Sequence, residues 1–521
     1  MQKDLQHWQS WQNLNWHNTR KAAVYTANVR VNKMEEEFEK AFLPFFYFFC
    51  FLCYYGVRVK KSQSGCDWIN EHFRTEKYMK ILFVSLGCDK NLVDTENMLG
   101  ILKNKGFEFT DDEWDADIIA VNTCCFIGDA KQESINTILE MAEHKKDAKC
   151  KVLVAAGCLA HRYQDEIIKE IPEVDAFVGT SSYDKIADMI TSVLEEKGIT
   201  NFVEDADRMP MVKEDRIVTT PGYYEYLKIA EGCDKRCTYC IIPKVRGNYR
   251  SFPVEYLISQ AEKLVAGGVR ELILVAQETT LYGVDLYGKK SLPMLLHELS
   301  KIKDLKWIRI LYCYPEEIDD ELIEAIKNEP KVCHYLDMPI QHASDNVLKR
   351  MGRRTNKKEL IDITARLRRE IPDIALRTTL ITGFPGETYE EHQEVMEFID
   401  ECEFDRLGVF TYSREEDTPA ASMPDQIDEA VKEEYRDEIM RLQQEISADR
   451  SADMVGSILE VMIEGYIAED NTYVGRSYKD APNVDGLVFV ECDRELMSGD
   501  FVNVLITGST EYDLIGKIVE E

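Results

Sequence analysis

Three cysteines near the middle of the chain have the spacing of an iron–sulfur cluster site. Cys233, Cys237 and Cys240 form the pattern C-x3-C-x2-C, and no fourth ligand follows at the spacing that a zinc site needs. A 4Fe–4S cube has four irons that each want a thiolate, so three cysteines leave one iron open to a substrate or cofactor. The pattern therefore favours a catalytic cluster over a zinc knuckle or a chance grouping.

Three further cysteines each lie just beyond an apolar run that predicts a buried strand. They are Cys88, Cys124 and Cys158, and the runs before them span residues 81–84, 117–121 and 152–156. Alternation of these strands with helical patterns predicts a parallel sheet, in which strand ends lie side by side. We therefore expect a second three-thiolate site, although structural buried cysteines are common. The adjacent Cys125 should point elsewhere.

The C-x3-C-x2-C motif opens a longer repeating pattern between residues 219 and 450. Six predicted strands alternate with amphipathic helices, which indicates a partial (β/α)6 barrel with its chemistry at the strand carboxyl ends. Glycines there would let the backbone approach a nucleoside or amino-acid moiety, although Gly383 could merely make a turn. Arg377 could bind a carboxylate or pair with an acid. The other polar candidates at these strand ends are Gln277, Gln341 and Thr379.

The first 78 residues differ in composition from the rest of the chain. They hold four of the six tryptophans and an aromatic run at residues 42–55. That run is shorter than the roughly 20 residues that a membrane-spanning helix needs, so we expect no membrane anchor. We expect Met79 to be the natural start and residues 1–78 to be an extension that is not part of the working protein.

The last 70 residues, 452–521, predict a small β-barrel. Five short strands separated by turn residues are typical of an OB-like fold, which often binds nucleic acid. This segment holds 4 basic and 15 acidic residues, a net charge of -11, which would repel a phosphate backbone.

The whole chain has 521 residues, so several domains are expected. It carries 63 basic and 95 acidic residues, a net charge of -32, which favours basic partners. Its fifteen cysteines show no disulfide-type spacing, which fits a reducing cytoplasm with thiolate–metal chemistry.

The order of these motifs resembles that of the methylthiotransferases, a family of radical S-adenosylmethionine (SAM) enzymes. The resemblance covers Met79 to the C-terminus and implies an α/β architecture of three domains. These are a parallel α/β methylthiotransferase domain at 79–200, a radical SAM core at 219–450 and a TRAM-type barrel at 452–521. Cys125 departs from the small residue expected beside Cys124, and the N-terminal extension has no counterpart in the family.

The resemblance also implies cofactors and chemistry. It implies two 4Fe–4S clusters, one on each set of three cysteines, with Tyr239 near the adenine of SAM. Further SAM contacts would come from Gln277, Gln341, Arg377, Thr379 and Gly383. One SAM would yield a radical that takes hydrogen from the β-carbon of an aspartate, and another would supply the methyl group of the added methylthio group. The implied substrate is small-subunit ribosomal protein S-twelve, and the implied electron donor is a flavodoxin or ferredoxin.

Two other functions remain open from the sequence. The same chemistry on a tRNA adenosine would need a basic surface to gather phosphates, and the acidic terminal barrel disfavours it. A non-enzymatic iron–sulfur protein would have no need of two sites with an open iron. We therefore expect a cytoplasmic enzyme that acts on a protein.

Overall fold

The computed structural model describes residues 79–195 and 200–519, and the predicted extension with its aromatic run lies outside this range. The first described unit is a parallel six-stranded sheet of order β2-β1-β3-β4-β5-β6. Its strands are β1 (Lys80–Ser85), β2 (Glu108–Phe109), β3 (Ile118–Thr123), β4 (Val152–Ala156), β5 (Ala176–Val178) and β6 (Thr200–Phe202). Its helices are α3 (Asp89–Asn104), α4 (Gly128–Asp147), α5 (Gly157–Arg162), α6 (Gln164–Glu170) and α7 (Ile186–Glu195).

Helices cover both faces of this sheet because its strands are apolar on both sides. Leu82 of β1 packs in a cluster with Met141 of α4, whereas the adjacent Phe83 packs with Leu102 of α3 and Ile190 of α7. Successive strand residues point to opposite faces, so an unbroken apolar run needs cover on both. The predicted parallel α/β fold is confirmed.

The second unit is an open, parallel six-stranded sheet of order β14-β13-β12-β11-β10-β7, which confirms the predicted partial barrel. Its strands are β7 (Tyr224–Lys228), β10 (Glu271–Val275), β11 (Trp307–Ile310), β12 (Val332–Asp337), β13 (Ala375–Thr382) and β14 (Arg406–Thr411). The main helices are α9 (Val254–Ala266), α11 (Leu292–Ser300), α12 (Asp320–Asn328), α14 (Lys357–Glu370), α15 (Tyr389–Cys402) and α16 (Glu429–Ala452). Shorter helices are α8 (Ile242–Val245), α10 (Val284–Tyr287) and α13 (Asp345–Met351), and β8 (Ala230–Glu231) pairs with β9 (Arg250–Ser251).

The third unit is a closed five-stranded barrel of order β15-β16-β17-β19-β18, as predicted. Its strands are β15 (Ile458–Ile467), β16 (Thr472–Ser477), β17 (Val488–Glu491), β18 (Phe501–Ser509) and β19 (Leu514–Ile518). The buried Arg476 of β16 attaches it to the central unit, because its guanidinium lies 2.7 Å from a carboxylate oxygen of Glu271 in β10. Met462 of β15 also packs into the apolar cluster inside the central sheet.

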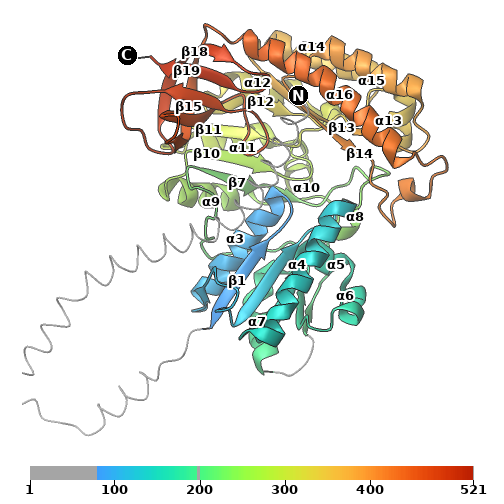
Figure 1. Cartoon of the computed structure of the whole chain (residues 1–521), viewed down its shortest axis with the longest axis vertical. Helices are drawn as coiled ribbons and strands as arrows, with labels where there is room; N and C mark the ends of the chain where they lie inside the picture. The colour runs from blue at the N-terminus through green and yellow to red at the C-terminus, as the bar shows by residue number, and fades with distance from the viewer. Residues whose placement is uncertain (1–78, 196–199, 520–521) are drawn as a thin grey trace, which may run out of the picture.

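The three units form one elongated body (Figure 1). The N-terminal sheet occupies one end, and the closed barrel lies beside the central sheet at the other, while α16 runs along β13 and β14. Strand β6, which lies in the polar stretch beyond α7, forms an edge of the first sheet. This short, half-exposed edge strand is polar and lacks the alternation that marks a strand. Within the described residues, no helix has the length and apolarity needed to cross a membrane.

Candidate functional site

The loop that carries Cys233, Cys237 and Cys240 follows the short strand β8. It begins at Gly232, whose φ is +72°, and a Cβ there would lie 2.0 Å from the carbonyl oxygen of Asn248. Only glycine fits this approach without displacing backbone. The Cys233 amide then donates to the Gly247 carbonyl (3.1 Å), which ties the first thiol of the motif to the neighbouring turn.

The structure brings the three thiols of this motif together. Cys233 and Cys237 are buried and Cys240 is half-buried. Burial raises the pKa of the Cys233 thiol to about 12, and the nearby Cys237 raises it further. Burial also raises the pKa of Cys240, and both other thiols of the motif add to that shift. Such thiols ionise readily only beside a positive charge, which a metal cluster supplies.

Charged and aromatic side chains surround these thiols. Lys235 lies within the motif, and its ammonium is 3.2 Å from Glu316 and 3.9 Å from Glu278. Burial raises the pKa of Glu278 to about 7 in spite of this cation. The hydroxyl of Tyr314 is 3.8 Å from the sulfur of Cys237. Within the described residues, one carboxylate oxygen of Glu278 is buried without a hydrogen-bond partner, which is typical of a site that awaits a polar ligand.

Four of the predicted SAM contacts lie around this site. The side-chain oxygen of Gln277 is buried and lacks a hydrogen-bond partner among the described residues. Gln341 has a φ of +75°, and its amide donates to the Thr379 carbonyl at 2.9 Å. Tyr239 packs against the cluster that includes Phe384, which follows β13. Their contacts to SAM stay a prediction, since the described contacts are all within the protein.

The other two predicted contacts have partners of their own. Arg377 of β13 pairs with Asp337 of β12 at 2.9 Å and with Asp485 of the closed barrel at 3.3 Å. Of its two suggested roles, the structure shows pairing with acids. Gly383 has a φ of +70°, and a Cβ there would lie 2.1 Å from the side chain of Lys432 in α16. That glycine therefore permits the packing of α16, in addition to making the turn.

The second set of thiols gathers at the carboxyl end of the N-terminal sheet, as predicted. Cys88 immediately precedes α3, Cys124 follows β3, and Cys158 lies in the first turn of α5. Burial raises the pKa of Cys124 to about 12, and the thiols of Cys158 and Cys88 raise it further, which places all three within electrostatic reach. Cys125 is also buried, and burial and the neighbouring Cys158 and Cys124 raise the pKa of its thiol while Arg162 lowers it, so this thiol also lies near the N-terminal set.

Both sets of thiols fit an iron–sulfur cube by their number and grouping, and five of the six are buried or half-buried, whereas Cys88 is exposed. Each supplies three sulfur ligands, which is one fewer than the irons of a cube. In the residues that the structure describes, no three His, Cys, Asp or Glu side chains converge closely enough to hold a single metal ion.

Gly157 positions Cys158, and its replacement by alanine provides a test. Its φ is +86°, and a Cβ would lie 2.2 Å from the side-chain oxygen of Asn122. We expect Gly157→Ala to lower the free energy of unfolding by about 1–3 kcal/mol for the backbone strain alone, and by more for the clash. Denaturant titration of the purified protein measures this change.

A matched control separates the clash from the backbone strain. Gly288 has a similar φ of +71°, but no atom lies within 4 Å of the position of a Cβ. Gly288→Ala should therefore lower the free energy of unfolding only by the cost of backbone strain. Equal losses in the two variants would contradict a close approach at Gly157.

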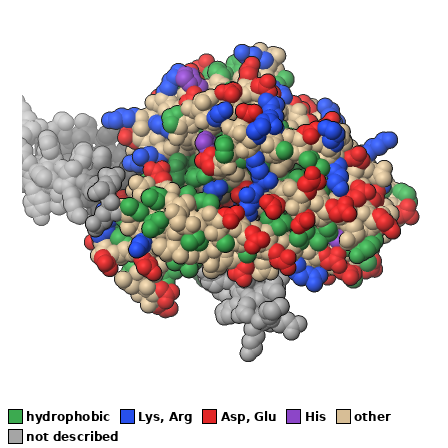
Figure 2. Space-filling view, turned by 90° about the horizontal axis from the view of Figure 1, so that it is seen from above, with side chains coloured by type: hydrophobic (Ala, Val, Ile, Leu, Met, Phe, Trp, Pro, Cys, Tyr) green, Lys and Arg blue, Asp and Glu red, His purple; other side chains and the backbone are tan. Residues whose placement is uncertain are grey.

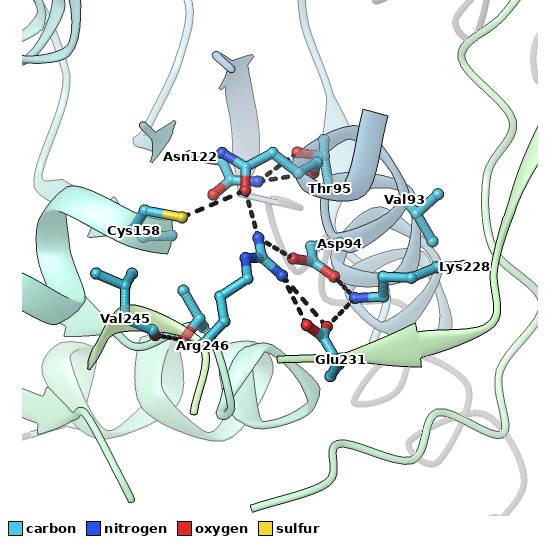
Figure 3. Close-up of polar contacts among 12 residues, drawn as sticks. Val93, Asp94, Thr95, Asn122, Cys158, Lys228, Glu231, Val245 and Arg246 are labelled. Carbon is cyan, nitrogen blue, oxygen red and sulfur yellow. Dashed lines mark hydrogen bonds and ion pairs between the residues drawn. The ribbon is translucent and has the colours of Figure 1, made fainter. Parts of the chain in front are cut away.

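The sequence analysis missed a polar network between the two sets of thiols. Arg246, beyond α8, contacts Asp94 of α3 and Glu231 of β8, and Lys228 of β7 bonds the same two carboxylates (Figure 3). All four of these charged side chains are buried. A signal was present, because the four consecutive residues Asp94 to Asn97 are all polar and lie shortly after Cys88.

Farther along α3, a buried glutamate of this helix lies close to a buried glutamate of β7. Glu96 of α3 accepts hydrogen bonds from the amide (2.7 Å) and hydroxyl (2.9 Å) of Thr219. Arg216 lies 3.5 Å from Glu96 and 3.3 Å from Glu225 of β7, so one cation serves two acids. Burial and the charge of Glu96 raise the pKa of Glu225 to about 8.

This pair should make stability depend on pH. Between about pH 4.5 and 8 the folded protein holds a proton on Glu225 that the unfolded chain releases, so stability falls as pH rises. One such proton changes the free energy of unfolding by about 1.4 kcal/mol per pH unit. Glu225→Gln should flatten the decline, as measured by calorimetry across this range. The exposed Glu434→Gln is the control, and an unchanged slope in Glu225→Gln would contradict the assignment.

Each of the three units matches the model of a known protein family. The model of an uncharacterized protein family, UPF0004, matches residues 80–179, that of the radical SAM superfamily matches 227–399, and that of the TRAM domain matches 455–519. The central match includes the C-x3-C-x2-C loop and the four strands β10 to β13 of the partial barrel. The fold and site therefore define a radical SAM enzyme with a C-terminal TRAM domain.

Relatives with assigned names show which family of radical SAM enzymes the chain resembles. The ribosomal protein uS12 methylthiotransferase RimO of Lachnoclostridium phytofermentans is 62% identical over 438 residues, covering 84% of this chain and 99% of that protein. The proteins of the same name from Trichlorobacter lovleyi and Clostridioides difficile are 50% and 51% identical over 98% and 99% of their lengths. The chain belongs to the RimO family of radical SAM methylthiotransferases. Enzymes of this class use iron–sulfur clusters and SAM.

Proposed function

We propose that this enzyme adds a methylthio group to an aspartate of ribosomal protein uS12. The observation that carries the proposal is the 62% identity to a uS12 methylthiotransferase over 99% of that protein. The small-subunit protein is rich in lysine and arginine, as ribosomal proteins generally are, and so complements an acidic enzyme. We further propose that the reaction takes place in the cytoplasm with electrons from a flavodoxin or ferredoxin.

The two sets of thiols would take different parts in this reaction. We assign a SAM-binding 4Fe–4S cluster to Cys233, Cys237 and Cys240, and a second cluster to Cys88, Cys124 and Cys158. When bound, the clusters supply the electron for SAM cleavage and the site that holds the sulfur to be transferred. The chain itself holds the two sites near each other and excludes water, through the buried residues between α3 and the central sheet.

Residues around the central thiols are suited to bind SAM. The unpartnered oxygens of Gln277 and Glu278 are acceptors for the amino group of an amino-acid moiety. The half-buried ring of Tyr239 adjoins the motif and is placed to stack on a base. Gln341, beyond β12, donates its backbone amide to the Thr379 carbonyl in β13 at 2.9 Å, which holds these two residues side by side.

The charge of the TRAM barrel supports a protein substrate. Its buried acids are neutralised within the protein: Asp480 pairs with Arg406 at 2.5 Å, and Arg476 pairs with Glu464 at 2.7 Å. The exposed charges that remain are mostly acidic. The exposed acids are Asp453, Glu460, Glu469, Asp470, Glu491, Asp493, Glu495 and Glu511, whereas the exposed basic residues are Arg494 and Lys517. Such a surface repels RNA and attracts a basic peptide segment.

Acidic side chains are not confined to this barrel. Figure 2 shows them gathered also on the side of the molecule where α15 and α16 lie, while basic and apolar side chains are mixed across the middle of the same face. Substitutions in each of the two acidic regions would therefore distinguish a role of the barrel from an effect of overall charge.

The direct experiment offers two substrates to the reconstituted enzyme. The enzyme is incubated with SAM, a reductant and either ribosomal small subunits or unmodified tRNA, and products are identified by mass spectrometry. We expect a gain of one methylthio group on an aspartate of uS12 and unchanged tRNA. Methylthioadenosine in the tRNA, with uS12 unmodified, would overturn the proposal.

Charge reversal on the TRAM barrel should weaken substrate recognition. Asp493 and Glu495 are exposed between β17 and β18, and replacing both by lysine should raise the KM for uS12 by about tenfold, with kcat little changed. The control replaces the exposed Glu433 and Glu434 of α16 by lysine, which makes the same change in net charge elsewhere. Equal effects in both variants would mean that only overall charge matters, and that the barrel has no special role.

A further inference from the structure

Helix α3 has a buried face that is polar, which is unusual for a helix between two domains. Asn91, Asp94, Thr95, Glu96 and Asn97 are each at most 5% exposed. Buried ion pairs often add little stability relative to well-packed apolar residues, because desolvation offsets their attraction. A role in fixing one arrangement of the domains accounts better for a face of this kind than a gain in stability does.

Arg246 is the centre of this interface. Its guanidinium lies 3.0 Å from Asp94 and 3.1 Å from Glu231, and it donates a third hydrogen bond to the side-chain oxygen of Asn91. Lys228 bonds both carboxylates as well, so two cations and two anions form a closed, neutral group (Figure 3). The side chain of Arg246 is 1% exposed, which leaves it no solvent to replace these partners.

The residues that Arg246 contacts lie next to both sets of thiols. Glu231 ends β8, two residues before Cys233 of the central motif. In the metal-free chain the thiol of Cys158 donates to the side-chain oxygen of Asn91 at 3.7 Å. The Asn91 amide donates to the carbonyls of Leu86 and Thr123, both at 3.0 Å, just before Cys88 and Cys124, and these two bonds do not depend on a thiol proton. One side chain therefore connects the segments that carry both sets of thiols.

We propose that Arg246 is a positioning residue that sets the distance and orientation between the two thiol sites. Methylthio transfer needs the two sites to act on one substrate atom, whereas SAM cleavage needs only the central site. Arginine suits this task because its planar guanidinium holds five donors in fixed directions, whereas the ammonium of lysine is a compact charge on a flexible stem. The proposal goes beyond the proposed function; the measurements of product ratio below rest on that function, whereas the measurements of hydrogen exchange do not.

The first test compares two products of the same enzyme. In Arg246→Lys we expect 5′-deoxyadenosine to form at a rate close to that of the unchanged enzyme. Methylthiolated uS12 per 5′-deoxyadenosine should fall by about 10- to 100-fold, the loss that a misplacement of about 1 Å causes. A parallel fall in both products would overturn the proposal.

A matched control accounts for general destabilisation. Arg309 is equally buried, and it pairs with Glu271 at 2.7 Å where the central sheet meets the TRAM barrel. Arg309→Lys removes a comparable buried pair without touching either thiol site. It should leave the ratio of the two products unchanged, and an equal change in ratio would show that any weakened interface uncouples the enzyme.

The second test does not depend on any reaction. Hydrogen exchange of the metal-free full chain should show faster exchange in α3 and the β8–α8 segment for Arg246→Lys but not for Arg309→Lys. Unchanged exchange in α3 would overturn the proposal even if activity fell. If wild-type enzyme leaves uS12 unmodified while this exchange result holds, the proposed function fails and the positioning role stands.

A second variant covers the case in which Arg246→Lys does not fold. Asn91→Ala removes the hydrogen bonds of the Asn91 side chain to Arg246, Cys158 and the Leu86 carbonyl, but keeps the ion pairs of Arg246 with Asp94 and Glu231. We expect it to reproduce the lower product ratio with a smaller change in the exchange of α3. A normal ratio in this variant would contradict the proposed path through Asn91.

Discussion

Replacing Cys233, Cys237 and Cys240 together by alanine should abolish reductive cleavage of SAM. The three thiols lie on one loop and within electrostatic reach of each other, and the proposed cluster has no other thiolates to bind it there. We expect 5′-deoxyadenosine to fall to the level seen without protein. The N-terminal site should keep its iron, because its thiols come from separate elements of a different sheet. Chromatography of the nucleoside and iron analysis of the same sample measure both.

The control for this variant is a cysteine of the same domain that lies away from the loop. Cys402 is buried at the end of α15, and Cys402→Ala should cleave SAM normally. Formation of 5′-deoxyadenosine by the triple variant would show that the assignment of the SAM-binding cluster is wrong. Loss of all iron would show instead that the two sites do not load independently.

The second large effect is expected from replacing Cys88, Cys124 and Cys158 together by alanine. Two cubes share the six thiolates equally, so this variant should lose about half of its iron. It should still cleave SAM, because the central loop is intact, but it should transfer no methylthio group to uS12. Unchanged iron content would contradict the assignment of this site.

Cys125 provides the matched control for the N-terminal site. Cys158 and Cys124 raise the pKa of the Cys125 thiol and Arg162 lowers it, whereas Cys158 and Cys88 raise that of Cys124. Cys125→Ala should therefore retain iron and activity, whereas Cys124→Ala should lose the N-terminal cluster. A larger loss of iron in Cys125→Ala than in Cys124→Ala would show that Cys125, and not Cys124, is the cluster ligand.

Much of the fold could be predicted from the sequence because apolar periodicity is a local signal. The runs at 81–84, 117–121 and 152–156 each became a strand of a parallel sheet with helices on both faces. The positions of the thiols followed from topology, since parallel strands end at a common edge. The spacing of Cys233, Cys237 and Cys240 needed no fold at all, because a short loop already confines three thiols to one place.

Only the tertiary structure decided how polar residues are used. Arg377 and Gly383 had two interpretations from the sequence, and the structure shows partners for both in elements far along the chain: Asp485 for one and Lys432 for the other. Arg246 was not identified, because its acceptor Asn91 lies 155 residues away. Local patterns report whether a residue is apolar, but a buried polar side chain is stable only beside its partner, and that partner is set by the packing of domains.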